Sequence, residues 1–457
     1  MSAERRGFFE HDEFEVHKPK NEFRIFAFGG STVQGNPYSI ETSFTRFLEQ
    51  SLNHAQPSAQ WRVVNCGGIS YASYRLVPLM QECLQYQPDL MIVCTGHNEF
   101  LEDITYSTIR NTGSPIASVY SVLGRFRSYR LIRNLISDSR QQRREQPLSV
   151  SESSESTKTV PSAGAKPVLS QEVDALLDHE GGLEAYVRDD VHADLVVRHF
   201  GSNLRRMRTI CDNAGVPFLL IQPPSNLADS PPFKSTFSEQ TTASQQDAIA
   251  DHLSTAAAEM RTNSDAALRE LEQAASLDNR FAFTWYQIGH VRLALGDVVG
   301  AKLAFVKARD EDVCPLRMTT ALEAAMHQMK DETESHFIDA AAVLSEKSGQ
   351  SIIGDNVLVD HIHPSFRGHQ WIAVAIAEWM EAEGLLIAEN SLWGQQVDLV
   401  FEQHIQSLDN MYFLKGRRRL QDLMGWAAGR AEGPPIVRQK RSYEGTSAAG
   451  APGRSPL

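Results

Sequence analysis

The sequence predicts an α/β protein: a three-layer α/β/α fold around a doubly wound, five-stranded parallel sheet of the flavodoxin-like kind, with an inserted all-α helical-repeat segment. Two observations predict this fold. Continuous apolar runs alternate with amphipathic stretches, which is typical of parallel strands covered by helices on both faces. A separate alanine-rich stretch at 245–315 has helical periodicity and no strand within it.

The predicted strands are short apolar runs, and the predicted helices between them have apolar residues at helical spacing. The strands are expected at 23–28, 61–66, 89–96, 216–223 and 335–340. The helices that cover them are expected at 41–55, 74–86, 195–215 and 367–383. Beyond this alternation, further helices are expected at 265–282 and as a pair within 285–312, and one or two near the C-terminus.

Two segments interrupt the alternation. Residues 139–170 are rich in serine, proline and charge, so they bury too little apolar surface to offset their ordering entropy and should form a disordered loop. Residues 285–312, "WYQIGHVRLALGDVVGAKLAFVKARDED", match the offsets of a tetratricopeptide repeat, a helical pair of about 34 residues. The alternative is a generic helical hairpin.

These segments divide the chain into parts. An N-terminal arm precedes an α/β domain in two pieces, which flank the inserted helices, and a C-terminal region of one or two helices ends in a disordered tail. The expected bounds are 1–22 for the arm, 23–244 and 316–386 for the domain, 245–315 for the insert and 387–457 for the C-terminal region.

Composition excludes several classes of function. The chain has 457 residues, 42% of them hydrophobic, and its formal charge of −13 argues against nucleic acid as a partner. Its 5 cysteines lack metal-site spacing and are expected to be buried. No apolar run reaches the roughly 20 residues of a membrane span, and the N-terminus lacks the core of a signal peptide. We therefore expect a soluble chain that is cytoplasmic unless an upstream segment is missing.

Four polar stretches follow predicted strands or precede the last helix, where open α/β sheets place their sites. They are "GGST" at 29–32, "NCGGIS" at 65–70, "GHNEF" at 96–100 and "DHIHPSFRGH" at 360–369. A serine hydroxyl needs an imidazole to accept its proton, and that imidazole needs an acceptor to fix its tautomer. Ser31, His363 and Asp360 could supply these three groups.

Other interpretations of the same residues remain open. Ser31 could be a helix N-cap, Asn98 a turn residue, and the loop that carries Asp360 a surface loop with capping duties. His361 or His369 could replace His363 as the base. A zinc site built from "DHIH" and His369 is conceivable, although no further ligand cluster supports it.

In these four blocks the sequence resembles the SGNH/GDSL hydrolase (esterase/lipase) superfamily, in a bacterial branch with an inserted tetratricopeptide-like helical segment. The resemblance covers about 23–100, 195–235 and 316–385. It implies Ser31 as nucleophile, His363 as base and Asp360 as its orienting acid. It also implies Asn98 and the Ser31 amide as oxyanion donors, with no metal and no cofactor.

Three positions depart from the family pattern. Gly30 replaces the aspartate that usually precedes the serine, and Glu99 replaces the aspartate that usually follows the asparagine. Ser70 stands where the family has its oxyanion glycine, so the remaining donor is either the Ser70 amide or that of Gly68.

The resemblance implies an ester hydrolase, an esterase or deacylase that works through an acyl-enzyme intermediate. Its expected substrate is a small-molecule or carbohydrate acyl ester. One alternative is an O-acyltransferase that uses the same triad. The other is a non-catalytic helical-repeat protein, because repeat helices can bind a protein partner through the insert.

Overall fold

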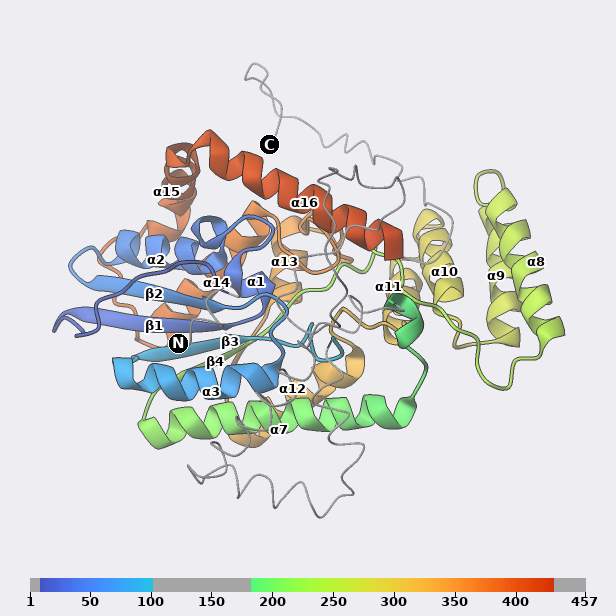
Figure 1. Ribbon diagram of the computed structural model, residues 1–457. Coiled ribbons are helices and arrows are strands. Elements are labelled where there is room, and N and C mark those ends of the chain that lie inside the picture. The colour runs from blue at the N-terminus through green and yellow to red at the C-terminus, as the bar shows by residue number, and fades with distance from the viewer. Residues whose placement is uncertain (1–8, 102–181, 431–457) are drawn as a thin grey trace, which may run out of the picture.

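A five-stranded parallel sheet forms the centre of the computed structural model, which describes residues 9–101 and 182–430 (Figure 1). Its strand order is β2-β1-β3-β4-β5, which is the doubly wound order of flavodoxin-like sheets. The strands are β1 (Glu22–Gly29), β2 (Gln60–Gly67), β3 (Leu90–Cys94), β4 (Phe218–Gln222) and β5 (His336–Asp339). The predicted α/β class and the five predicted strands are confirmed.

Helices cover both faces of this sheet (Figure 1). Successive side chains of β1 point to opposite faces, so Ile25 and Ala27 join one apolar cluster while Phe26 and Phe28 join the other. The first cluster is covered by α2 (Phe44–Ala55), α13 (Ala340–Ser348), α14 (Phe366–Ala382) and α15 (Trp393–Ser407). The second is covered by α3 (Ser73–Cys83), α7 (Asp190–Ala214) and α12 (Thr320–Thr333).

Most helix boundaries agree with the sequence pattern to within a few residues, and the exceptions have local causes. The predicted helix at 41–55 is split, because Ser43 ends the 3-10 helix η2 (Ile40–Thr42) and accepts a hydrogen bond from the Thr45 amide at the start of α2. The predicted helix at 74–86 ends as α3 at Cys83 and continues as the 3-10 turn η3 (Leu84–Tyr86). Helices α12 and α13 were not predicted, and α13 has only 9 residues.

Five helices lie between β4 and β5, and the first four belong to the segment inserted before α12. These four are α8 (Ala243–Glu259), α9 (Ser264–Leu277), α10 (Ala282–Ala294) and α11 (Val298–Asp310). Helices α8 and α9 project away from the sheet in Figure 1, whereas α10 and α11 lie nearer to it. Helices α10 and α11 approach closely at Gly289, where an added Cβ would lie 2.6 Å from the ring of Phe305. The assignment as a tetratricopeptide repeat and the division into domains stay predictions.

The C-terminal region, which was expected to hold one or two helices, has two. Helix α15 ends at Ser407, and α16 (Asn410–Arg430) starts after a short break. Asp409 accepts a hydrogen bond from the Tyr412 amide at 2.6 Å, which starts α16. Helix α16 then packs its Gly416 against the ring of Tyr38.

Some expectations fall outside the described residues, namely the disordered loop at 139–170 and the tail beyond residue 430. All 5 cysteines are free and buried, as predicted. Among the helices within 9–101 and 182–430, none is long and apolar enough to cross a membrane.

Candidate active site

The turn after β1 carries Ser31 and is shaped by two glycines. A Cβ at Gly29 would lie 2.1 Å from the Cys94 carbonyl oxygen of the neighbouring strand β3. A Cβ at Gly30 would lie 2.4 Å from Nδ2 of Asn98. Because neither glycine has a side chain, the turn after β1 can lie directly against the end of β3. Ser31 begins the short helix α1 (Ser31–Gln34), and the side chain is 6% exposed.

Ser31, His363 and Asp360 form one hydrogen-bonded chain, although Ser31 and His363 are 332 residues apart in sequence. His363 Nδ1 lies 2.6 Å from Asp360 Oδ2, and His363 Nε2 lies 2.7 Å from Ser31 Oγ. Because an ionised carboxylate only accepts hydrogen bonds, Nδ1 carries the imidazole proton. Nε2 is then the acceptor, and the Ser31 hydroxyl donates to it. This arrangement lets the imidazole take a proton from the serine.

Asp360 is held as a carboxylate by the groups around it. Burial alone would raise its pKa, but the nearby imidazoles of His363 and His361 and the hydrogen bonds from His363 lower the pKa well below its ordinary value. Its second oxygen, Oδ1, accepts from the backbone amides of Ile362 and His363, each at 2.8 Å. The carboxylate therefore stays ionised and fixes its own loop as well as the imidazole.

Hydrogen-bond donors converge near Ser31 from three segments. Asn98 donates one of its two Nδ2 hydrogens to the Tyr71 carbonyl at 3.1 Å, which leaves the second for another acceptor. Within the described part of the chain the Ser31 amide has no acceptor either. The Gly68 amide, by contrast, donates to the Gly29 carbonyl at 3.0 Å. The sequence left two candidates for the remaining oxyanion donor, the backbone amides of Gly68 and Ser70. The Gly68 amide is already hydrogen-bonded within the described residues, and the Ser70 amide is not.

Ser70 lies in a tight turn between Gly68 and Tyr71. The Tyr71 amide donates to the Gly68 carbonyl at 3.1 Å across the turn. Ser70 itself has φ +59°, in the left-handed region that glycine adopts without cost. A serine holds this left-handed conformation at a cost of roughly 1–2 kcal/mol.

A buried polar network that the sequence did not reveal lies under the Ser31 turn. The Val33 carbonyl accepts from Asn65 Nδ2 at 2.7 Å and from Ser43 Oγ at 2.6 Å. Asn65 Nδ2 also donates to Thr45 Oγ1 at 2.8 Å, and Asn65 Oδ1 accepts from the Gly67 amide at 2.9 Å. Asn65 thus joins α1, β2 and α2 beneath the turn. Its place in the "NCGG" block was the signal that could have indicated this role.

Glu99, which follows Asn98, is bound to the start of α3. Its carboxylate accepts from the Ser73 amide and from Ser73 Oγ, both at 2.8 Å, at the start of α3. A negative charge at a helix N-terminus is favourable. Glu99 is 1% exposed and acts on the loop that carries Asn98 by tying it to α3.

The other histidines near the site do not contact Ser31. His369 Nδ1 accepts from the Phe44 amide at 3.2 Å, and burial lowers the His369 pKa to about 3. The His361 ring packs against Phe233, and its pKa is lowered to about 4 by burial despite nearby Asp360. Within residues 9–101 and 182–430, no three His, Cys, Asp or Glu side chains are grouped to hold a metal ion.

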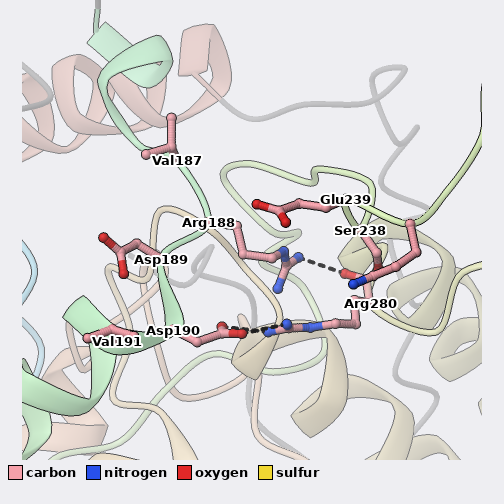
Figure 2. Close-up of a pocket in the computed structure, with 9 residues that line it drawn as sticks. Val187, Arg188, Asp189, Asp190, Val191, Ser238, Glu239 and Arg280 are labelled. Carbon is pink, nitrogen blue, oxygen red and sulfur yellow. Dashed lines mark hydrogen bonds and ion pairs between the residues drawn. The ribbon is translucent and has the colours of Figure 1, made fainter.

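A pocket of about 380 Å³ opens elsewhere, at the start of α7 beside the helical segment (Figure 2). None of the predicted site residues lines it. Arg280 pairs with both oxygens of Asp190 at 2.7 and 2.8 Å, and Arg188 pairs with Glu311 at 2.7 Å, so both guanidinium groups are already matched by carboxylates. The pocket is lined by Val187, Arg188, Asp189, Asp190, Val191, Ser238, Glu239, Gln240 and Arg280.

Comparison with known proteins gives distant structural likenesses. No protein-family model matches the sequence, and no curated protein matches it significantly. An acetylxylan esterase from Geobacillus stearothermophilus is 11% identical, with a TM-score of 0.33 over 78% of this chain and 93% of the esterase. A protein described as a GDSL-like lipase, from Parabacteroides merdae, is 12% identical, with a TM-score of 0.36 over 80% and 98%. At these scores the likenesses carry no argument about function.

Proposed function

We propose that this chain is a serine esterase or deacylase of the SGNH type. The observation that carries the proposal is the hydrogen-bonded chain from Ser31 through His363 to Asp360. Ser31 Oγ attacks an acyl carbonyl while His363 Nε2 takes its proton. The alcohol leaves with that proton, and an acyl group remains on Ser31. Water then attacks the acyl-enzyme with His363 again as the base, the acyl–Oγ bond breaks, the carboxylic acid leaves and His363 returns the proton to Ser31 Oγ.

The donors around Ser31 fit the charge that develops in this reaction. The second Asn98 Nδ2 hydrogen, the Ser31 amide and the Ser70 amide are the proposed oxyanion donors, and each is without an acceptor within the described residues. Losing one such donor typically lowers kcat by about 10²–10³. We assign the remaining donor to Ser70 rather than to Gly68, since the Gly68 amide already donates to Gly29.

The proposed substrate is a small-molecule or carbohydrate acyl ester. This part rests on the resemblance of the four sequence blocks to the SGNH/GDSL superfamily, because a fold by itself does not define a substrate. A panel of O-acetylated sugars and short-chain esters would rank the candidate substrates by kcat/KM.

An O-acyltransferase is the second candidate, because the same triad can pass the acyl group from Ser31 to an alcohol. A transferase passes the acyl group to an alcohol instead of water. Analysis of the products formed with a sugar acceptor present separates the two reactions. A protein partner for the helical segment stays a prediction.

Hydrolysis of p-nitrophenyl acetate tests the proposed function. The wild-type protein should release nitrophenol, and Ser31→Ala should reduce the rate to that of the buffer. Ser51→Ala is the matched control, because Ser51 is a fully buried serine whose Oγ donates to the Phe47 carbonyl within α2. Equal rates for Ser31→Ala and the wild type would exclude Ser31 as the nucleophile.

A further inference from the structure

Asn226 binds the loop that carries Asp360 through three hydrogen bonds. It lies in the loop after β4 and is 1% exposed. Its side-chain Nδ2 donates to the Asp360 carbonyl oxygen and to Asp355 Oδ1, both at 2.9 Å. Its backbone amide donates to the His361 carbonyl at 2.9 Å. One residue thus binds two successive carbonyls of the segment that carries the carboxylate.

Asn226 is itself held on its remaining sides. Its Oδ1 accepts from the Asp229 amide at 2.9 Å, and its carbonyl accepts from Arg317 Nη1 at 2.9 Å. Arg317 is 2% exposed and also donates to the Ser230 carbonyl at 2.7 Å. Because every polar group of Asn226 is engaged, its side chain has one orientation. A residue with one orientation can fix the position of what it binds.

Arg317 belongs to the segment that leaves the helical insert after α11. Its guanidinium lies 3.6 Å from Asp312, whose two oxygens accept from the Phe233 and Lys234 amides at 2.7 and 2.9 Å. The loop after β4 is therefore hydrogen-bonded to this segment at Asn226, Ser230, Phe233 and Lys234. Asn226 also binds the Asp360 carbonyl, so it links this segment to the loop that carries Asp360.

We propose that Asn226 is a positioning residue for the Asp360–His363 pair, a role that rests on the proposed function of this site. It acts by fixing the Asp360 backbone, so that the carboxylate holds the imidazole 2.7 Å from Ser31 Oγ. A displacement of about 1 Å in such a group can lower a rate by about 10²-fold. Asn226→Ala should therefore lower kcat by about 10²-fold, with KM within a factor of about two of the wild type.

A charge-swap series separates positioning from general support of the loop. In Asn226→Asp an oxygen replaces Nδ2 and faces the oxygens of both Asp355 and Asp360, so both kcat and Tm should fall. Adding Asp355→Asn restores a donor between positions 226 and 355, but the Asp360 carbonyl still lacks one. The double variant should therefore recover Tm without recovering kcat. Recovery of kcat together with Tm would overturn the proposal.

Asn356→Ala is the matched control, because Asn356 is an exposed residue of the same loop that accepts from the Gly354 amide at 2.8 Å and, within the described residues, has no hydrogen bond to Asp360. It should keep the wild-type kcat. A wild-type kcat in Asn226→Ala, or an equal loss in Asn356→Ala, would also overturn the proposal. If Asn226→Ala does not fold, the kcat and Tm of Asn226→Asp/Asp355→Asn test the proposal instead.

A spectroscopic readout keeps this inference separate from the proposed function. The proton between His363 Nδ1 and Asp360 Oδ2 should give a downfield proton resonance, which requires no substrate. The resonance should be present in the wild type and in Asn356→Ala and be lost or shifted upfield in Asn226→Asp/Asp355→Asn. An unchanged resonance in the double variant would contradict the role of Asn226, whether or not the protein hydrolyses esters.

Discussion

The two sides of the candidate site are held in place by different forces. On the nucleophile side, Ser31 is positioned by backbone segments that pack without side chains between them, at Gly29 against Cys94 and at Gly67 against Gln34. On the acid–base side, Asp360 and His363 lie in a loop fixed by side-chain hydrogen bonds, chiefly those of Asn226. The first side should therefore be sensitive to added volume and the second to changes in charge or hydrogen bonding.

Acid should give the largest effect, through buried histidines beside the acid–base loop and in α14. Burial lowers the pKa of His97 to about 3, of His361 to about 4 and of His369 to about 3, whereas it raises that of Asp312 to about 6. Between pH 6 and pH 4 the unfolded chain therefore binds three more protons at the histidines and one fewer at Asp312. The unfolded chain therefore binds a net two more protons than the folded chain. As the pH is lowered from 6 to 4, the free energy of unfolding should fall by about 3 kcal/mol for each pH unit.

Chemical denaturation at pH 7, 6, 5 and 4 measures this slope. His369→Asn removes one titrating group and keeps an acceptor for the Phe44 amide, so it should reduce the slope by about 1.4 kcal/mol per pH unit. A free energy of unfolding that does not change between pH 6 and pH 4 would contradict the neutral, buried state of these histidines.

Added volume on the nucleophile side should come next in size. In Gly67→Ala the new Cβ would lie 2.2 Å from the Gln34 amide nitrogen and 2.7 Å from its Cα, both of which are backbone atoms. The variant should lose about 3 kcal/mol of stability or more, together with its activity. Thermal unfolding compares it with Gly394→Ala in α15, where a Cβ has open space. The control should be stabilised by about 0.5–1 kcal/mol.

If Gly67→Ala unfolds like the wild type, close backbone packing does not hold the Ser31 turn. In that case the two sides of the site would not differ in the way described above.

Asn98→Ala should affect the rate but leave the fold largely unchanged. It removes the proposed side-chain oxyanion donor and also the bond to the Tyr71 carbonyl. We expect kcat to fall by about 10²–10³-fold with little change in KM. Steady-state kinetics with p-nitrophenyl acetate provides the measurement. A loss confined to KM would assign Asn98 to substrate binding instead.

The smallest expected effect is a gain at Ser70. Ser70→Gly places glycine at φ +59° and keeps the backbone amide, so the variant should be stabilised by up to about 1 kcal/mol. Its kcat should equal that of the wild type, because the proposed donor belongs to the backbone. Calorimetry and kinetics together test this point. A large loss of kcat would instead assign a role to the Ser70 hydroxyl.

The sequence contains enough information to place the residues that directly follow strands. Ser31 follows β1 and Asn98 follows β3, and parallel strands bring their carboxyl ends to one edge, so these residues were expected to meet. Asn226 could not be found in this way. Its role depends on the path of an irregular loop rich in proline and serine, and no periodicity encodes that path. The donor choice between Ser70 and Gly68 likewise depended on which amide was already bonded.

Site mapping of a fluorophosphonate adduct tests the central claim most directly, because the probe reacts only with a serine that a nearby base activates. Mass spectrometry of the labelled protein should find one adduct, on the peptide that contains Ser31. The adduct should be absent in Ser31→Ala and form far more slowly in His363→Ala. An unlabelled wild-type protein, or an adduct on a different residue, would contradict the account.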